Sequence, residues 1–289
     1  MAVHKVPLPR GYRVRDVLAF HGRDAEGVAE QVSADRLRKA VMLAGVPVLL
    51  DVAFGTRAAT CSVEVDGPVG PALEAMIGDA LANILGLRID PARFLDFAGA
   101  DPLLGPLARE HKGLRIVQSA TVFEALTWAV IGQQINLTFA IALRRTFIQQ
   151  AGRRHSSGMW CYPEAADVAR LDVEALTSNK FSRSKAETLL RLAGLVADGK
   201  LSLDRTGDIE ATSAALLAVK GIGPWTVNYA LLRGYGYEDC SLHGDVAVRS
   251  ALQRLLGAAE KPSIAETERW LEAYAPHRTM VAAHLWASL

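Results

Sequence analysis

The chain has 289 residues, 50% of them hydrophobic, which is enough for one or two globular domains, and no apolar run is long enough to span a membrane. Its 32 basic and 31 acidic side chains give a net charge of only +1, which argues against a tight, nonspecific nucleic-acid binder. Three widely separated cysteines and an N-terminus without the apolar stretch of a signal peptide predict a reducing, cytoplasmic location.

The first third of the chain has a mixed α+β pattern. Two apolar runs, Val46–Phe54 and Ala58–Val65, flank a short turn and predict a β-hairpin, and a helix is predicted over Val69–Leu85. A turn-rich segment, Phe97–Pro106, follows. The change from a mixed pattern to a helical one predicts an α+β domain over residues 1–97 and a helical domain over residues 98–289.

Beyond the turn-rich segment the apolar periodicity is helical nearly to the end of the chain, so the molecule is predicted to be mainly α. The predicted helices are Ser119–Gln150, Asp172–Thr177, Lys185–Asp198, Asp208–Lys220, Pro224–Gly234, Asp245–Leu256 and Ile264–Leu289.

The connection between two of these helices has the composition of an anion site. Gly221 stands where a helix favours a left-handed stop, and Gly223 and Pro224 open the next helix. The backbone NH groups of Gly221, Gly223 and Thr226 can point together at one anion, helped by the positive end of that helix. A nucleic-acid phosphate fits such a site, although an ordinary αα-hairpin has the same local pattern.

Asp245 follows Trp225 by 20 residues and begins another apolar periodic segment. A helix N-terminus there favours the ionised carboxylate, although an aspartate at that position is more often only a helix cap.

Three ordered motifs together resemble one family. The hairpin and Asp245 resemble the helix-hairpin-helix and the Gly/Pro-rich loop with catalytic aspartate of the base-excision DNA glycosylase (HhH-GPD) superfamily, nearest to AlkA-type 3-methyladenine DNA glycosylases. F-E-A-L-T-W-A-V-I-G-Q-Q-I-N from Phe123 and Y-A-P-H-R-T-M-V-A-A-H-L-W from Tyr274 resemble two further segments of that family. The resemblance spans roughly residues 100–289.

The resemblance implies a small TBP-like N-terminal sheet domain before helical glycosylase domains, with the active-site cleft between helical subdomains. It implies a monofunctional enzyme that flips an alkylated purine, such as 3-methyladenine or 7-methylguanine, out of damaged double-stranded DNA and hydrolyses its N-glycosidic bond, leaving an abasic site. We expect a cytoplasmic, nucleoid-associated monomer with no membrane partner and no catalytic cofactor.

The resemblance also assigns roles to individual residues. Asp245 is the candidate catalytic carboxylate, and Gln133 or Gln134 is the candidate wedge that fills the gap left by the flipped base. The residues assigned to the base pocket are Trp225, Tyr229 and His277. Those assigned to DNA contacts are Lys220, Gly221, Gly223, Thr226 and Arg249. The backbone carbonyls of Leu217, Val219 and Ile222 are assigned to a structural Na⁺ or K⁺.

Departures from the family pattern sharpen these expectations. Bifunctional members carry a nucleophilic lysine where this chain has Trp225, so no lyase activity is expected. Cys61, Cys161 and Cys240 cannot assemble a four-cysteine iron–sulfur site. His277 replaces an aromatic ring, which favours a rival hypothesis, a non-catalytic DNA-structure-binding protein.

A glycosylase for deaminated or oxidised bases is a third hypothesis. Two alternatives stay open for Lys180, Arg183 and Lys185: they contact a DNA phosphate, or they simply lie in solvent at the start of a helix. Trp128, Trp270 and Trp286 lie in apolar helical rows and are predicted to be core residues.

Overall fold

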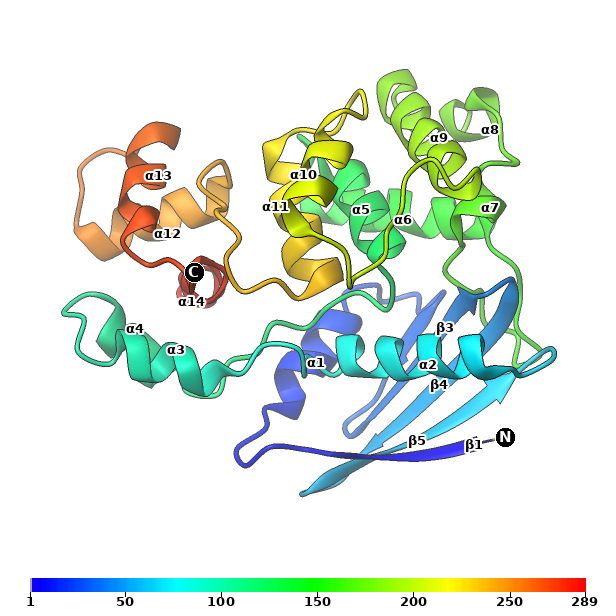
Figure 1. Cartoon of the computed structure of the whole chain (residues 1–289), viewed down its shortest axis with the longest axis horizontal. Coiled ribbons are helices and arrows are strands. Elements are labelled where there is room, and N and C mark those ends of the chain that lie inside the picture. Colours follow the sequence, from blue (N-terminus) through cyan, green and yellow to red (C-terminus); the bar gives the residue numbers. More distant parts are fainter. Residues whose placement is uncertain (1) are drawn as a thin grey trace.

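In the computed structural model, which describes residues 2–289, the N-terminal part is built on a five-stranded antiparallel sheet (Figure 1). The strand order is β1-β5-β4-β3-β2, so the meander of β2 to β5 is completed at one edge by the first strand of the chain. The strands are β1 Ala2–Pro7, β2 Glu30–Val32, β3 Arg36–Leu43, β4 Val46–Phe54 and β5 Ala58–Val65.

The predicted hairpin is confirmed as β4 and β5, which pair with Asp51 opposite Ser62. The neighbouring β3 was not predicted. From Lys39 onward nearly every residue of β3 is buried, because one face packs on the main core and the other on a small cluster that includes Met159 and Cys161. A strand buried on both faces lacks the alternation that identifies a half-exposed strand.

Two helices, α1 (Val14–His21) and α2 (Pro71–Ile84), pack against the sheet. Proline at the first position of α2 suits a helix start, because its missing NH would be unpaired there. The helix ends just before Gly86, which has a φ of +62°. The predicted helix over residues 69–85 is therefore confirmed to within two residues.

Two short helices that were not predicted, α3 (Pro91–Ala98) and α4 (Leu104–Glu110), flank a turn at residues 99–103, within the segment that was predicted to be turn-rich. They cover the C-terminal helix α14 (Arg278–Ala287), where the rings of Phe94 and His284 have centroids 4.7 Å apart. Each helix has eight residues or fewer, too short for a clear 3.6-residue period. The division into residues 1–97 and 98–289 stays a prediction.

The single helix predicted over residues 119–150 is wrong. The structure has α5 (Val122–Gly132) and α6 (Leu137–Ala151), separated by a turn in which Gln134 has a φ of +57°. Asn136 caps α6, its side chain accepting a hydrogen bond of 2.9 Å from the NH of Phe139. The left-handed Gln134 and the N-cap Asn136 end one helix and start another, although the apolar periodicity continues across them.

The single helix predicted over residues 264–289 is also wrong. α13 (Ile264–Glu272) and α14 are separated by a turn that contains Pro276. Proline lacks the NH that a helix interior requires, so the chain leaves the helix before it.

The remaining helices agree with prediction to within a few residues, except that α7 was not predicted and that the helix after the glycine turn ends in a π-helical segment, η1. In Figure 1, α12 to α14 lie with α3 and α4, whereas α5 to α11 form a separate group above the sheet. No helix in residues 2–289 is both long and apolar enough to cross a bilayer. The elements are α7 Ala165–Val168, α8 Val173–Thr177, α9 Arg183–Ala197, α10 Ile209–Leu217, α11 Pro224–Ala230, η1 Leu231–Tyr235 and α12 Val246–Leu256.

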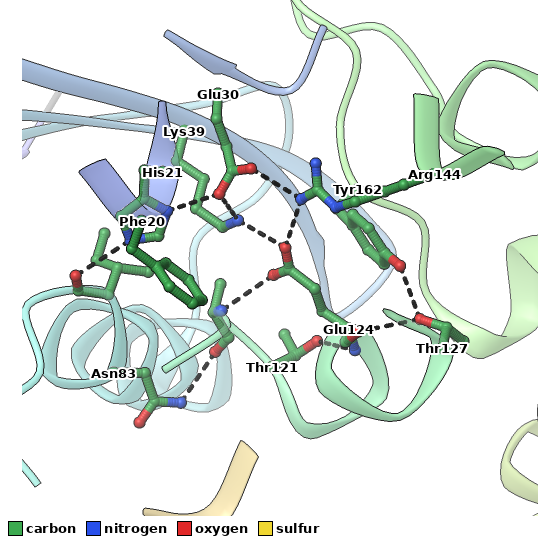
Figure 2. Close-up of polar contacts among 12 residues, drawn as sticks. Phe20, His21, Glu30, Lys39, Asn83, Thr121, Glu124, Thr127, Arg144 and Tyr162 are labelled. Atoms are coloured by element: carbon green, nitrogen blue, oxygen red, sulfur yellow. Dashed lines mark hydrogen bonds and ion pairs between the residues drawn. The ribbon is translucent and has the colours of Figure 1, made fainter. Parts of the chain in front are cut away.

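A buried ionic cluster joins the sheet to the helices (Figure 2). The ammonium of Lys39 on β3 donates to Glu30 of β2 at 2.7 Å and to Glu124 of α5 at 2.8 Å. Arg144 of α6 contacts the same two carboxylates at 2.9 and 2.8 Å. Burial alone would raise the pKa of Glu30, but Arg144 and Lys39 outweigh it and hold that pKa well below its usual value. Two cations therefore balance two carboxylates.

Candidate active site

The predicted hairpin forms between α10 and α11. Gly221 has a φ of +97°, and a Cβ at this position would overlap the hydroxyl of Thr188 on α9. Glycine is therefore required there for both conformation and space. Gly223 is the N-cap of α11 with Pro224 at the first helical position, as the sequence predicts. The exposed turn presents the N-terminus of α11 to solvent, a site that suits an anion.

Asp245 is the N-cap of α12 and accepts hydrogen bonds from four donors. Its Oδ1 accepts from the backbone NH groups of Ala247 at 3.0 Å and Val248 at 2.9 Å, and from the indole of Trp286 at 3.1 Å. Its Oδ2 accepts from the indole of Trp225 at 2.9 Å. The carboxylate is thus more than a helix cap, because two side chains from distant helices also orient it.

Aromatic rings form the wall beside this carboxylate. The rings of Trp225 and Tyr229, one turn apart on α11, have centroids 5.2 Å apart. The Tyr229 hydroxyl accepts a hydrogen bond of 2.9 Å from the indole of Trp128 on α5, which fixes both rings. The result is a flat apolar wall of the kind that stacks on a planar ligand.

These elements line an open cavity of about 1130 Å³. The turn between α5 and α6, the hairpin, the start of α12 and the end of α14 all contribute to its wall, together with Arg23 after α1 and Arg233 of η1. Asp245, Trp225 and the hairpin glycines therefore share one cavity between the two groups of helices. Such a volume accommodates a nucleotide-sized ligand.

Comparison with known proteins agrees with this geometry. The family model described as "HhH-GPD superfamily base excision DNA repair protein" matches residues 127–277, more than half of the chain. The chain belongs to this superfamily.

The chain also resembles individual proteins that are named as 3-methyladenine DNA glycosylases. The chain is similar to "DNA-3-methyladenine glycosylase" of Bacillus subtilis, with 35% identity over 179 residues, covering 60% of this chain and 59% of the relative. It is similar to "DNA-3-methyladenine glycosylase 2" of Escherichia coli, with 30% identity, covering 63% of each. The match thus spans about three fifths of these relatives.

The solved structure of a 3-methyladenine DNA glycosylase from Archaeoglobus fulgidus has the same fold. It superposes with a TM-score of 0.83 at 22% identity, covering 98% of this chain and 97% of that one. The HhH-GPD fold with a small N-terminal antiparallel sheet is therefore confirmed for nearly the whole chain.

The two glutamines of the second HhH-GPD motif differ in position. Gln133 donates to the carbonyl oxygen of Gly221 at 3.1 Å and to the hydroxyl of Thr226 at 2.9 Å, so it ties α5 to the hairpin. Gln134 is exposed at the cavity rim. Of the two wedge candidates, Gln134 is the exposed one, whereas Gln133 and Thr226 hold the hairpin in place.

The basic residues near the cavity also differ from one another, since some are exposed and one is bonded to backbone carbonyls. Lys220 is exposed beside the hairpin, and Lys180 and Arg183 are exposed at the start of α9. Lys185 donates to the carbonyls of Ile131 at 2.5 Å and Gln133 at 2.6 Å, and burial lowers its pKa. Lys185 therefore closes the C-terminal end of α5 rather than facing solvent.

Arg249 and His277 lie outside the cavity wall. Arg249 donates to the carbonyl of Pro262 at 2.7 Å, which ties α12 to the following loop. His277 packs against Phe97 at 4.8 Å and Phe94 at 6.4 Å between ring centroids. The structure therefore does not bring His277 to the cavity wall with Trp225 and Tyr229, because the turn before α14 directs this ring toward α3.

Sequence reasoning did not assign Trp128, Trp286 or Arg23 to the cavity. Trp128 is buried in a core cluster as predicted, but it also lines the cavity. Trp286, likewise predicted to be a core residue, is only partly buried, lines the cavity and contacts Asp245. Arg23 reaches the cavity from the N-terminal part. The L-W pair that ends the third HhH-GPD motif could have indicated Trp286, whereas no local signal marks Arg23.

Proposed function

We propose that this chain is a monofunctional DNA glycosylase of base-excision repair, which removes alkylated purines from damaged double-stranded DNA and leaves an abasic site. The observation that carries the proposal is the Asp245 carboxylate, oriented by two indoles at the wall of an aromatic cavity beside the glycine hairpin between α10 and α11. We also propose that it acts as a monomer on the nucleoid.

The chemistry requires a fixed negative charge near the sugar. A nucleotide cannot react inside the base stack, so the target base has to be flipped into the cavity. As the bond between C1′ and the base breaks, positive charge develops on the sugar, and Asp245 would stabilise it. The same carboxylate would take a proton from the attacking water, as the base of an inverting glycosidase does.

The cavity wall favours hydrolysis over lyase chemistry. A lyase needs an amine nucleophile, but among the described residues that line the cavity there is no lysine. Trp225 occupies the position of the bifunctional members' lysine and donates to Asp245.

The hairpin would hold the DNA backbone. The NH groups of Gly221 and Gly223 lie beside an exposed helix start, where a phosphate is favoured. In the described chain, no hydrogen bond reaches the carbonyls of Leu217 and Ile222, so these oxygens are free to ligate a cation. With the Val219 carbonyl they would hold the Na⁺ or K⁺ that the superfamily resemblance implies, which would bridge to phosphate.

Alkylated purines suit the aromatic wall. N-methylation places a positive charge on 3-methyladenine and 7-methylguanine, which makes them good leaving groups. Cation–π attraction to Trp225 and Tyr229 would contribute about 1 kcal/mol. The relatives from Bacillus subtilis and Escherichia coli are named for 3-methyladenine, which supports this substrate class.

The position of His277 bears on the non-catalytic rival. That hypothesis depended on a histidine in place of a pocket ring, but His277 packs on Phe94 and Phe97 outside the cavity wall. No observed feature of the cavity favours loss of catalysis.

Release of free base from methylated duplex DNA tests the proposal. We expect release by the wild type, loss of release in Asp245→Asn with DNA binding retained, and strand breaks only after mild alkali. Asp172→Asn is a matched control, because Asp172 caps α8 in the same way but lies outside the cavity wall. Release that survives Asp245→Asn would contradict the assignment of Asp245, and breaks before alkali would contradict monofunctional chemistry.

A further inference from the structure

The turn between α5 and α6, here called the wedge turn (residues 133–136), has an unusual backbone conformation. Gln134 has a φ of +57°, which is unfavourable for a residue with a Cβ unless the surrounding structure fixes it. Its side chain is exposed at the cavity rim, so burial of that side chain does not stabilise the turn. The conformation therefore depends on contacts made by neighbouring residues.

Lys185 of α9 makes the first of these contacts. Its ammonium donates to the carbonyl oxygens of Ile131 at 2.5 Å and Gln133 at 2.6 Å, at the end of α5 and directly before Gln134. Burial, with no contribution from a nearby charge, lowers the pKa of Lys185. The ammonium therefore binds backbone carbonyls rather than a carboxylate.

These carbonyls lie at the negative end of α5. The last carbonyls of a helix carry partial negative charge, because they lack intrahelical donors. That charge has the wrong sign beside an approaching DNA phosphate backbone, and the ammonium of Lys185 offsets it. The contact thus suits both the shape and the charge of a turn that meets DNA.

Gln133 makes the second contact and ties the wedge turn to the hairpin. Its side-chain amide donates to the carbonyl of Gly221 and to the hydroxyl of Thr226. Helix α9 reaches the hairpin as well, because Arg191 donates to the carbonyl of Lys220 at 3.1 Å. One helix and one glutamine therefore fix the wedge turn and the hairpin relative to each other.

We propose that Lys185 is a positioning residue, which holds the wedge turn beside the hairpin so that Gln134 enters the base stack where the hairpin holds the DNA backbone. The inference rests on the proposed glycosylase function. It concerns extrusion of the target base, not cleavage of the bond to the sugar.

The pairing state of the target base distinguishes positioning from general stability. Extrusion has to break pairing and stacking, and its cost is smallest for a base that is already unpaired. A displaced wedge should therefore slow release of a paired base and have much less effect on an unpaired one. A general loss of structure would slow both reactions alike.

Single-turnover release of 7-methylguanine measures this difference. The base would be incorporated at one site of a strand, which is annealed to a complement with either cytosine or a tetrahydrofuran abasic analogue opposite. Lys185→Met should lower the ratio of paired to unpaired release rates by at least about tenfold, because it removes two hydrogen bonds from a charged donor. Gln134→Ala removes the wedge itself and should lower the ratio in the same direction. Taking the ratio within one preparation cancels any loss of folded protein.

Lys200→Met is the matched control. Lys200 lies just beyond the C-terminal end of α9, where its exposed ammonium contacts Asp198 at 2.8 Å, and its replacement should leave the ratio unchanged. Gln133→Met removes the other anchor of the wedge turn and should also lower the ratio. This second variant keeps the inference testable if Lys185→Met does not fold.

An unchanged ratio in Lys185→Met, or in Gln133→Met should the first variant not fold, would overturn the inference. So would an unchanged ratio in Gln134→Ala, because the wedge would then lie elsewhere. Both results leave the proposed function standing, since the wild type still releases the base. A wild type that releases 7-methylguanine from neither duplex would overturn the proposed function itself.

Discussion

At the residue scale, the two oxygens of Asp245 are not equivalent. Oδ1 accepts three hydrogen bonds, two from the backbone of α12 and one from Trp286. Oδ2 accepts one hydrogen bond, from Trp225. Because Oδ2 keeps a free lone pair, it is the oxygen available to a water molecule or to the sugar.

This difference predicts unequal effects of removing the two indoles. Trp225→Phe removes the hydrogen bond to Oδ2 and should slow single-turnover base release by about tenfold or more, because a bond to a charged group is worth about 1.5–3 kcal/mol. Trp286→Phe should cost less, since two backbone NH groups still orient Oδ1. Rapid-quench measurement of base release compares the two, and equal losses would contradict the argument.

At the element scale, the hairpin depends on one glycine more than on the other. Gly221 is left-handed and meets Thr188, whereas Gly223 has a φ of −111° with open space at its Cβ position. The sequence places both glycines in the turn, but only the packing of α9 against the turn distinguishes them.

Gly221→Ala should therefore destabilise the protein by about 2–4 kcal/mol, the sum of a left-handed alanine and an overpacked contact. Gly223→Ala is the matched control and should change the free energy of unfolding by no more than about 1 kcal/mol. Denaturant unfolding measures both. Similar losses in the two variants would show that α9 does not constrain the turn.

The C-terminal helix carries a pH-dependent element. His284 of α14 is buried against Phe94 near His111, and burial lowers its pKa to about 4. Because the folded-state pKa lies below the unfolded value of about 6.5, the unfolded chain binds the extra proton first. Stability is then complete above about pH 6.5 and declines as the pH falls toward 4.

We expect His284 to contribute about 3 kcal/mol to this decline, from a shift of about 2.5 pKa units. His284→Gln removes the titrating group, so the free energy of unfolding should depend less steeply on pH between 6.5 and 4. Denaturant titrations at several pH values give that slope. An identical slope in the variant would show that the pKa of His284 does not differ between the folded and the unfolded states.

At the scale of the whole molecule, the buried cluster connects parts of the chain that are far apart in sequence. Glu30 and Lys39 come from the sheet, whereas Glu124 lies in α5 and Arg144 in α6, the two helices that border the cavity (Figure 2). Removing either cation leaves two buried carboxylates with one partner. A buried pair that loses one member is strongly destabilised.

Lys39→Met should lower the free energy of unfolding by about 3–5 kcal/mol, since Lys39 is fully buried between two carboxylates. Adding Glu30→Gln restores the charge balance and should recover part of the loss. A double-mutant cycle in denaturant measures this coupling. Strictly additive losses would mean that the two groups do not interact.

Much of the fold was predictable because its signals are local. The β4–β5 hairpin, α2, α9 and the turn after α10 depend on alternation, caps and glycine positions within short windows. The breaks near Gln134 and Pro276 were missed because apolar residues continue across them. The short helices α3 and α4 were missed because they are stabilised by packing on α14.

In the candidate site, too, some features follow from local sequence and others from tertiary packing. The sequence by itself determined the hairpin, the position of Asp245 at a helix start and the pairing of Trp225 with Tyr229, since each follows from residues close together in the chain. Only the tertiary structure decided that Trp286 orients Asp245, that Arg23 and Arg233 meet at the cavity, and that His277 turns away. These contacts join segments separated by up to hundreds of residues, and the packing of helices, which no local pattern specifies, brings them together.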